Sequence, residues 1–451
     1  MASSMIDSEL FKDYFGTADM RQVFSDENQI QKWMDCEAAL ARVEARLGII
    51  PSTAAEEISR KAHVSQINIG KIKQEIDKTG HPFIALVSVF KTLCEGRSGE
   101  YLHWGATTQD ILDSGLILQL REAYQIIERK LETVYDAVCE KAQSTRNIIM
   151  VGRTNGQQAI PITLGFKFAV WGFELQRQQQ RLTECRERLL VGQFAGAVGT
   201  VASLGSRGIE VQEAFFAELG LNTPPIAWFT SRDSLVEFAS VLAQIATTLG
   251  KIGNEVYALQ KGEIGELEEY SGGDSIGSST MPHKRNPFNA MQIVTLAKLT
   301  RSAAASMMDA AEQEHERDCR GMQVEWDALP RACLLTDAAL DKSIHLVRNL
   351  VVKPQQIEKN LGLLRGLIFS EAAMLKLAQT KGRQTAHHII HRLAMQAIDE
   401  GVNLRHLLRQ DPETTELISE HELDEIFEPK HYIGFSLEFV DRLINSRASR
   451  L

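Results

Sequence analysis

Residues 235–259, LVEFASVLAQIATTLGKIGNEVYAL, repeat an apolar side chain at alternating steps of three and four residues. This spacing places all the apolar side chains on one face of a single long α-helix. A helix with such a seam packs at a shallow angle against other long helices. The seam consists of Leu235, Phe238, Leu242, Ile245, Leu249, Ile252, Val256 and Leu259.

The same periodicity recurs on both sides of this stretch and predicts further long helices. One begins near Leu112, and others are expected at residues 162–190, 288–314 and 329–350. Strand signals are few and proline is sparse, so the pattern favours an all-α fold built around a bundle of long helices. One chain could hardly cover helices of this length on all sides, so we expect the bundle to self-associate.

Breaks in the helical pattern predict three helical domains. Residues 1–111 have the pattern of short helices, and residues 112–363 contain the long helices. A new helical pattern starts at Ser370, and proline-containing turns near Pro412 and Pro429 separate shorter helices after it. We therefore expect a small C-terminal helical domain at residues 364–451.

Composition excludes several classes of protein. The net charge of the 451 residues is −10, which does not favour binding to nucleic acid or to an anionic membrane surface. No apolar run is expected to span a membrane, and the N-terminus lacks the pattern of a signal peptide. The six cysteines have no CxxC spacing, which is typical of free thiols in a reducing cytoplasm. We expect a cytoplasmic protein with no membrane partner.

A polar, glycine-rich stretch follows the first helix described above. It runs from Ser271-Gly272-Gly273-Asp274 into Gly277-Ser278-Ser279-Thr280-Met281-Pro282-His283-Lys284-Arg285-Asn286-Pro287, and a new helix is expected to open near Phe288. Free backbone N–H groups and the positive end of a helix dipole make such a place favourable for a carboxylate. Lys284 and Arg285 add two positive charges there. By itself, such a stretch is also compatible with a surface loop of incidental charge.

Residues 277–287, the signature loop, resemble the signature G-S-S-x-M-P-x-K-x-N of the fumarase/aspartase superfamily at every position. The resemblance implies an all-helical homotetrameric lyase with shared active sites. Members remove a proton next to a carboxylate and expel an amine or oxygen leaving group. The resemblance makes Ser278 the proposed base, with Ser279 as the alternative, and Lys284 the stabiliser of charge. It also places Ser279, Met281 and Asn286 at the substrate.

Residues 103–110, HWGATTQD, lead into the helix that begins near Asp110. Taken alone, such a string is compatible with a helix cap. It resembles the first signature region of the superfamily, in which Thr and Gln hold substrate carboxylate oxygens. Thr107, Thr108 and Gln109 are therefore expected to orient a carboxylate with uncharged donors.

A third candidate stretch is Val151-Gly152-Arg153-Thr154-Asn155-Gly156-Gln157-Gln158-Ala159-Ile160-Pro161. Its glycines and proline predict a loop that leads into a helix. Arg153 is a candidate clamp for a carboxylate, because a guanidinium binds two oxygens in one plane. The stretch resembles the second signature region, G-R-T-H, with Asn155 in place of the His. Thr154 and Asn155 are expected beside the substrate.

The residue that normally pairs with that His is also replaced. In fumarases and adenylosuccinate lyases the His pairs with a Glu thirteen residues after the first Ser, and that position is Met291 here. Asn and Met cannot relay a proton. The 3-carboxy-cis,cis-muconate cycloisomerase branch also lacks this pair and expels a carboxylate, whose pKa near 4 removes the need for an acid. An expelled amine needs a proton, so the sequence favours the cycloisomerase branch.

Two further stretches resemble this branch. Residues 231–242, SRDSLVEFASVL, match its Q-R-D-R-L-V-E-F-A-S-V-L, and residues 314–330 match its E-H-E-R…E-W-x-x-L-P. Arg232 is thereby placed at the substrate, as are His315 and Arg317, which would reach it from another subunit. Other positions depart from the branch: Ser231 and Ser234 replace Gln and Arg, and Gln158 replaces a His. The lost cation leaves open whether the substrate is a di- or a tricarboxylate.

Two other functions stay open at this point. His81 stands where adenylosuccinate lyases carry a phosphate-binding or catalytic His, which favours a C–N lyase that releases fumarate from a substituted succinate. From the residues alone, His81 in its Gly/Pro turn is compatible with a structural role. A helical protein without activity on this scaffold, as in lens crystallins, is the third hypothesis. The retention of Ser278, Lys284 and Asn286 argues against it.

No cofactor or metal is expected. The glycines of residues 197–208 lack the spacing of a nucleotide-binding fingerprint and predict a loop between helices. His387 and His391 form an i, i+4 pair without a third ligand, and they are expected on a solvated or packed helix face. The expected partners are a small-molecule di- or tricarboxylate substrate and further copies of the chain. The sequence leaves the substrate, the direction and the stereochemistry open.

Overall fold

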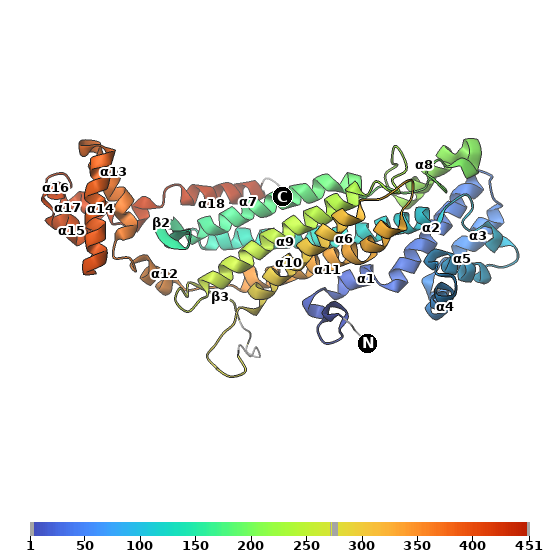
Figure 1. The fold of residues 1–451 in the computed structure, drawn as a ribbon, viewed down its shortest axis with the longest axis horizontal. Helices are drawn as coiled ribbons and strands as arrows, with labels where there is room; N and C mark the ends of the chain where they lie inside the picture. Colours follow the sequence, from blue (N-terminus) through green and yellow to red (C-terminus); the bar gives the residue numbers. More distant parts are fainter. Residues whose placement is uncertain (1–3, 271, 273–277, 449–451) are drawn as a thin grey trace. The chain divides into compact units, whose positions relative to one another are not determined.

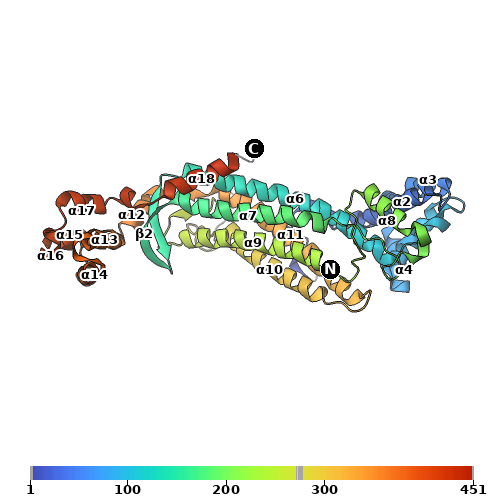
Figure 2. The same ribbon diagram turned by 90° about the horizontal axis from the view of Figure 1, so that it is seen from above.

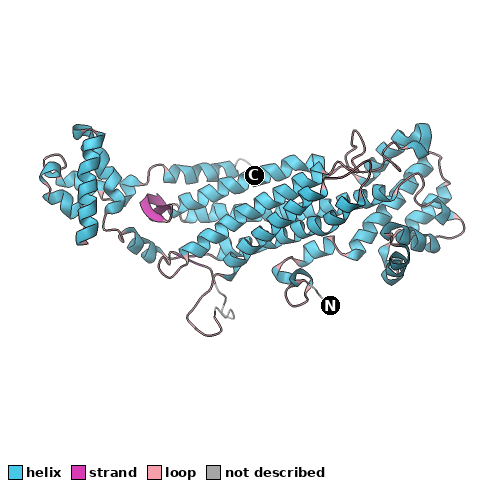
Figure 3. Ribbon diagram, viewed as in Figure 1, coloured by secondary structure: helices cyan, strands magenta, loops and turns pink. Residues whose placement is uncertain are grey.

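The computed structural model describes residues 4–270, 272 and 278–448, and helices account for most of them (Figures 1 and 3). Gly277 and most of the glycine-rich stretch before it, residues 271 and 273–276, lie outside the described residues. The expectation of a mostly helical chain is confirmed.

The five predicted long helices are all present. Every side chain of the predicted seam in α9 is at most 1% exposed. Burying a large aliphatic or aromatic side chain completely contributes about 1.5–3 kcal/mol, so the seam accounts for the position of α9 among its neighbours. The five helices are α6 (Thr108–Ser144), α7 (Leu164–Leu189), α9 (Asp233–Leu259), α10 (Phe288–Ala310) and α11 (Cys319–Asn349).

Polar contacts accompany this packing. Figures 1 and 2 show α9 and α10 side by side, and Arg301 of α10 donates a hydrogen bond to the hydroxyl of Thr247 in α9 (3.2 Å). Gln178 of α7 donates to the buried hydroxyl of Thr248 (3.1 Å). The helices therefore pack through apolar seams, and polar side chains add hydrogen bonds between them.

Two helix boundaries differ from the prediction. Helix α11 begins at Cys319, ten residues before the expected start at Leu329, and Pro330 lies inside it. The helix continues on both sides of Pro330, although proline more often ends or kinks a helix. Helix α10 ends at Ala310 rather than near residue 314.

The prediction of a loop at residues 151–161 is wrong, because this stretch forms a β-hairpin. Strand β1 (Ile149–Thr154) pairs antiparallel with β2 (Gln157–Thr163), drawn in magenta in Figure 3. Asn155 and Gly156 form the two-residue turn with φ angles of 52° and 79°. Asn-Gly is the preferred sequence for such a turn because both residues tolerate positive φ. A second small sheet pairs β3 (Leu267–Glu268) with β4 (Val351–Val352), so the fold is mostly helical rather than strictly all-α.

The N-terminal part consists of short helices, as predicted. Helix α2 covers the predicted helix near residues 37–48, and its N-cap Ser25 accepts a hydrogen bond from the backbone of Asn28. Gly48 follows α2 with a φ of 71°, a conformation that favours glycine. The helices are α1 (Ala18–Val23), α2 (Asp26–Arg46), α3 (Ser52–Lys61), α4 (Ile69–Thr79), α5 (Pro82–Leu93) and α8 (Gly208–Leu219).

The C-terminal part also consists of helices, and α13, α14, α15 and α17 pack around an apolar cluster that includes Leu377, Leu393, Leu404 and Leu423. Their bounds are α12 (Pro354–Leu361), α13 (Ser370–Lys381), α14 (Arg383–Glu400), α15 (Leu404–Gln410), α16 (Pro412–Thr415), α17 (Glu420–Ile426) and α18 (Ser436–Ala448). Short 3₁₀ helices lie at Met5–Asp7, Lys12–Tyr14, Val64–Gln66, Ser98–Tyr101, Ala202–Arg207, Leu367–Phe369 and Pro429–Tyr432. The one at Ala202–Arg207 occupies part of the stretch predicted as a loop.

The chain forms two compact units. Unit 1 comprises residues 1–132, 177–250 and 292–341, and unit 2 comprises the remaining stretches, 133–176, 251–291 and 342–451. The division of the sequence into three helical domains stays a prediction.

Helix α9 meets the length and hydropathy expected of a membrane-spanning helix, contrary to the expectation from sequence that no run would do so. However, 61% of its most apolar window is buried inside the structure. It is the single such helix among the described residues, and its burial is that of a core helix.

Candidate active site

The predicted site residues are divided between the two units. In unit 1, Thr107 precedes α6, and Thr108 and Gln109 form its first turn. In unit 2, Arg153 lies on β1, and the signature loop precedes α10.

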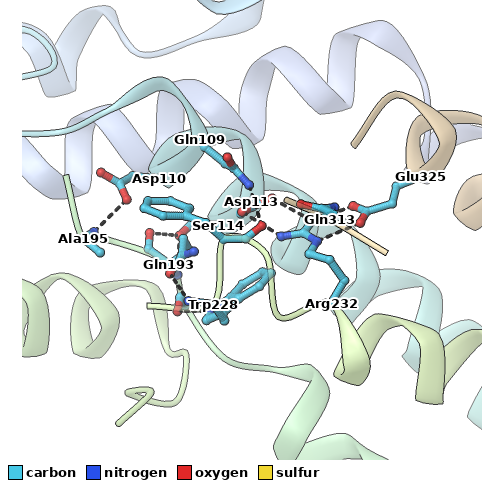
Figure 4. A network of polar contacts seen from close by, with 12 residues as sticks. Gln109, Asp110, Asp113, Ser114, Gln193, Ala195, Trp228, Arg232, Gln313 and Glu325 are labelled. Atoms are coloured by element: carbon cyan, nitrogen blue, oxygen red, sulfur yellow. Dashed lines mark hydrogen bonds and ion pairs between the residues drawn. The ribbon is translucent and has the colours of Figure 1, made fainter. Parts of the chain in front are cut away.

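Asp110 organises the group in unit 1 (Figure 4). Its completely buried carboxylate accepts hydrogen bonds from the backbone N–H groups of Thr107 (2.8 Å), Ala195 (2.7 Å) and Gly196 (3.1 Å). Burial raises the pKa of Asp110 to about 6, and these three donors hold it from rising further. The carboxylate thus ties the start of α6 to the chain at residues 195–196.

Arg317 and Gln109 meet at Phe229. The guanidinium of Arg317 lies 4.9 Å from the ring centroid of Phe229, and Gln109 donates a hydrogen bond to the Phe229 carbonyl (3.1 Å). Arg317 also donates to the hydroxyl of Thr107 (3.0 Å) and to the carbonyl of Ala197 (2.9 Å). Because the Thr107 hydroxyl accepts this bond, its own hydrogen can be donated to a carboxylate oxygen. The structure therefore brings Thr107, Gln109 and Arg317 of one chain together, whereas the sequence placed Arg317 at the substrate from another subunit. The binding of a carboxylate by this group stays a prediction.

His315 and Thr108 lie at the edge of this group. His315 is exposed and has a φ of 56°, a conformation that few residues other than glycine adopt. Thr108 is partly exposed at the first position of α6. Their contact with substrate stays a prediction.

Arg232 is buried in an ion-pair network (Figure 4). It is 1% exposed and donates to both oxygens of Asp113 (3.0 Å each) and of Glu325 (2.7 and 2.6 Å). Burial opposes the charge of Arg232, but the two carboxylates outweigh it and raise the pKa of the guanidinium. The indole of Trp228 lies 4.8 Å from the guanidinium. All three donor nitrogens are engaged, so the predicted contact of Arg232 with substrate would require displacement of one of these carboxylates.

His81 has a structural contact within unit 1. It is the N-cap of α5, where its Nδ1 accepts a hydrogen bond from the backbone of Ile84 (3.3 Å). This contact fits the structural alternative weighed from the sequence, and a role in substrate binding stays a prediction.

Sequence analysis did not single out a His/Glu pair in unit 1. His103 Nδ1 lies 2.8 Å from Glu37 Oε1, and the His103 backbone N–H donates to the other oxygen (2.8 Å). Burial opposes the charge on His103, but Glu37, which is 1% exposed, outweighs it and raises the pKa of His103. The signal was present in the sequence, because His103 opens the stretch that contains Thr107–Gln109, and Glu37 stands directly before the apolar run Ala38–Ala41.

Arg153 in unit 2 forms a planar, two-point contact with a carboxylate, as predicted, but the carboxylate belongs to the same chain. Its two terminal nitrogens donate to Glu266 at 2.9 and 2.6 Å. Glu266 is completely buried and also accepts a hydrogen bond from Asn360 (2.8 Å). Binding of a substrate carboxylate by Arg153 stays a prediction.

Thr154 and Asn155 lie at the exposed tip of the hairpin. Asn155 stands where the resemblance places the superfamily His. Its positive φ is the backbone conformation that this two-residue turn requires. Thr154 pairs with Gln157 across the turn. Their substrate contacts stay predictions.

The described part of the signature loop is mostly exposed, including Ser279, Met281 and Lys284. The hydroxyl oxygen of Ser278 accepts hydrogen bonds from the backbone N–H groups of Thr280 (3.3 Å) and Met281 (3.1 Å). Among the described residues, the ammonium of Lys284 takes part in no ion pair, whereas Arg285 is paired with Glu268. Of the two adjacent positive charges expected here, Lys284 is thus the one that no described carboxylate pairs with.

The expectation of free N–H groups at the start of α10 is wrong. The carboxylate of Glu269 accepts hydrogen bonds from the backbone N–H groups of Asn289 (2.9 Å) and Ala290 (3.0 Å). Phe288 donates its backbone N–H to the carbonyl of Asn286 (3.0 Å). A helix start satisfied by an internal carboxylate cannot also bind one from the substrate.

The structure offers no cluster of three or more His, Cys, Asp or Glu side chains suited to a metal within its described ranges. His387 and His391 of α14 are exposed, and their rings stack with centroids 6.1 Å apart. Four of the six cysteines are buried, as expected of packing residues: Cys36, Cys139, Cys185 and Cys333.

Comparison with known proteins gives matches over nearly the whole chain. Residues 14–299 match a family model described as lyase, and residues 366–443 match a model of the adenylosuccinate lyase C-terminus. The chain is 40% identical to N-acetyl-S-(2-succino)cysteine lyase of Dickeya dadantii over 98% of each chain. It is 41% identical to adenylosuccinate lyase of Methanocaldococcus jannaschii over 96% of this chain and 94% of that protein.

Solved structures give the same picture. The crystal structure of the 3-carboxy-cis,cis-muconate lactonizing enzyme from Pseudomonas putida superposes with a TM-score of 0.91 at 38% identity. The match covers 97% of this chain and 98% of that one. The similar proteins thus differ in substrate while they share one fold.

Proposed function

Because this chain belongs to the fumarase/aspartase superfamily of lyases, we propose that it catalyses β-elimination from a succinate-like carboxylate, and the reverse addition, through an enediolate. In the elimination direction a base removes the proton from the carbon next to a carboxylate. The electron pair moves onto that carboxylate. It then returns to form the C=C bond as the leaving group departs from the neighbouring carbon with its own bonding pair.

The choice of leaving group rests on the side chains of Asn155 and Met291. Asn155 forms the hairpin turn, Met291 is 44% exposed, and neither side chain titrates. Without this acid/base pair, a leaving group that is stable as an anion is favoured. We therefore propose an internal carboxylate as leaving group, as in a 3-carboxy-cis,cis-muconate cycloisomerase. A C–N lyase of the adenylosuccinate type is the alternative, in which another group would have to protonate the amine.

Ser278 is the proposed base, and its environment supports it over Ser279. Two backbone N–H groups point at the Ser278 oxygen, and such donors stabilise an alkoxide. Lys284 is the proposed stabiliser of the enediolate. A preorganised donor at such a site contributes about 3–4 kcal/mol to the transition state.

Uncharged donors would hold the substrate carboxylates. Thr107, Thr108 and Gln109 are proposed for this role, with Arg317 as the neighbouring cation. Asn286 is proposed as a further donor from the signature loop. The elimination itself requires no cofactor.

A thiolate is the second candidate for the leaving group. One relative, 40% identical over 98% of the chain, is named for the cleavage of N-acetyl-S-(2-succino)cysteine. A thiol has a pKa of about 8.5, so it leaves as an anion far more readily than an amine does. Cleavage of a C–S bond would therefore also proceed without the missing acid.

We further propose that the protein is a cytoplasmic homotetramer with shared active sites. Large apolar side chains exposed on the long helices support self-association. They include Val170 on α7, Tyr257 on α9, Met308 on α10 and Trp326 on α11. Six free cysteines support a reducing compartment.

The test is a spectrophotometric panel of three substrates: 3-carboxy-cis,cis-muconate, N-acetyl-S-(2-succino)cysteine and adenylosuccinate. Ser278→Ala serves as the base-deficient variant, and Ser279→Ala is its matched control. We expect turnover of one of the first two substrates, abolished by Ser278→Ala and largely retained by Ser279→Ala.

Each outcome separates the candidates. Loss of muconate absorbance supports the cycloisomerase, and release of a free thiol supports C–S cleavage. Turnover of adenylosuccinate alone would contradict the argument from the missing acid/base pair. Equal activity of Ser278→Ala and the wild type would reject Ser278 as the base.

A further inference from the structure

Three of the acidic side chains between α9 and the signature loop are each bound to a different part of unit 2: Glu266, Glu268 and Glu269. Glu266 binds Arg153 and Asn360, as described above. Glu268 instead binds Arg285, near the end of the signature loop, and Glu269 binds Asn289, just after it. The two ends of the loop are therefore joined to each other by side-chain contacts.

Glu268 makes the first of these contacts. One of its oxygens pairs with Arg285 (2.5 Å), and the other pairs with Lys353. Burial raises the pKa of Glu268, but these two cations outweigh it and hold the pKa below its usual value. The backbone of Glu268 is itself fixed, because it pairs with Val351 in the small sheet of β3 and β4.

Glu269 makes the second contact, at the start of α10. Besides the two backbone bonds, it accepts a hydrogen bond from the side chain of Asn289 (2.7 Å). The carboxylate is only 7% exposed. Three donors on one buried carboxylate fix the helix end that follows the loop.

Gln260 joins both ends with a single side chain. Its amide oxygen accepts the backbone N–H of Glu269 (2.8 Å), and its amide nitrogen donates to the carbonyl of Arg285 (3.1 Å). Arg285 is thus held at its guanidinium and at its carbonyl. Its neighbours in sequence are Lys284 and Asn286, the two proposed substrate-binding residues of the loop.

We propose that Gln260, Glu268 and Glu269 are positioning residues that hold Lys284 and Asn286 in place through Arg285 and the start of α10. A cation stabilises a developing negative charge best when it does not have to move as the charge forms. In this arrangement Arg285 serves as the anchor, while the charge of Lys284 remains available to the substrate. This inference rests on the proposed function, which gives Lys284 its role.

The activity test breaks the Glu268–Arg285 contact from both sides. Glu268→Gln, Arg285→Gln and the double variant are assayed on the substrate that the wild type turns over. We expect each single variant to lower kcat by about 10- to 100-fold with little change in KM, because a displacement near 1 Å has effects of this size. The double variant should resemble the single ones, because all three lose the same contact.

Two further variants make the activity test specific. Arg285→Lys keeps a cation opposite Glu268 and should recover part of the lost kcat. Glu438→Gln removes an exposed acid that pairs with Arg442 on α18, and it should leave kcat unchanged. Equal losses in this control and in Glu268→Gln would overturn the positioning role.

A second measurement needs no substrate. Hydrogen exchange of the Asn289 and Ala290 amides is compared between the wild type and Glu269→Ala, with Glu269→Gln as the milder variant. We expect at least about tenfold faster exchange once the carboxylate acceptor is lost. Unchanged exchange would show that Glu269 does not fix this helix end.

The two measurements separate the two proposals. Faster exchange together with lower kcat supports the positioning role. Faster exchange with unchanged kcat would overturn it and leave the proposed function standing. If the wild type turns over no substrate of the panel, the proposed function and the positioning role fall together, while the exchange rates still report whether the anchor exists.

Discussion

Glu44 is a buried carboxyl group without a hydrogen-bond partner among the described residues. It lies on α2 and is completely buried, and neither of its oxygens is bonded. Burial, with a smaller contribution from the charge of Glu37, raises its pKa to about 9. At neutral pH this side chain is therefore a neutral acid in the folded protein and a carboxylate in the unfolded one.

This difference predicts a pH dependence of stability. Between about pH 4.5 and 9 the folded state holds a proton that the unfolded state has released, so the free energy of unfolding should fall as the pH rises. Glu44→Gln removes the titration, and we expect a higher Tm than the wild type at pH 8 and a smaller difference at pH 5. Glu27→Gln, at an exposed position of α2, is the control. A Glu44→Gln curve parallel to that of the wild type would contradict the raised pKa.

Arg232 predicts a large effect on stability. Arg232→Leu leaves the buried carboxylates of Asp113 and Glu325 without their cation, and removal of one partner from a buried ion pair destabilises by about 3–5 kcal/mol. Arg188 offers a matched control, because it binds both oxygens of Glu237 in an exposed setting. Arg188→Leu should lose at most about 1 kcal/mol. Urea denaturation measures both, and equal losses would refute the distinction between buried and exposed pairs.

At this scale the sequence predicted which side chains bind carboxylates better than it predicted which carboxylates they bind. It identified Arg153 as a two-point carboxylate binder, yet Glu266, 113 residues further along the chain, is the carboxylate it holds. It likewise placed Arg232 at the substrate without the means to see that Asp113 and Glu325 surround it. A guanidinium presents the same donors to an internal carboxylate and to a substrate, so its sequence neighbours cannot distinguish them.

At the scale of elements, a close approach in unit 2 lies between the end of α6 and the start of α7. A Cβ atom added to Gly165 would lie 2.7 Å from the carbonyl oxygen of Ala142 and 2.7 Å from Cα of Arg146. Both neighbours are backbone atoms, which cannot move aside as a flexible side chain could. The small size of residue 165 therefore permits the two helices to meet at this distance.

Gly165→Ala should therefore destabilise the protein by roughly 1–3 kcal/mol, the usual range for overpacking. Gly362→Ala is the control, because its Cβ would meet its nearest atom at an ordinary 3.7 Å and its φ of −84° suits alanine. Thermal unfolding of the two variants compares them directly. A Gly165→Ala variant as stable as the wild type would show that α6 and α7 can separate at this point without loss.

The long helices were predictable because their apolar periodicity extends over many turns, as the seam of α9 shows. The hairpin was missed because its glycines and proline were taken as loop signals, although Asn155-Gly156 between two short runs is a hairpin signal. The start of α11 was misplaced because Pro330 is tolerated within it. Local residue preferences fail where packing against other elements decides the conformation.

At the scale of the whole molecule, each compact unit draws on three separate stretches of the chain. The three domains predicted from the sequence are contiguous ranges, so they cannot describe units built from separate stretches of the chain. The family and the mostly helical fold could nevertheless be predicted, because the signature loop and the helical periodicity are both local features of the sequence.

The proposed homotetramer predicts the mass in solution. Sedimentation equilibrium should give four times the chain mass of 50.4 kDa. If the active sites are shared between subunits, specific activity should fall on dilution together with the average mass. A monomeric mass with full activity would contradict both the tetramer and the shared sites.

The hairpin turn also favours deamidation of the protein during storage. Asn155 is exposed and is followed by Gly156, which has no side chain to hinder attack of its backbone nitrogen on the Asn155 amide. The attack expels ammonia and forms a cyclic imide, which water then opens to aspartate or isoaspartate. Either product adds a negative charge two residues from Arg153. Stored samples should therefore gain negative charge at this turn. The fraction of more acidic protein, measured by isoelectric focusing, then gives the fraction of hairpins that have changed.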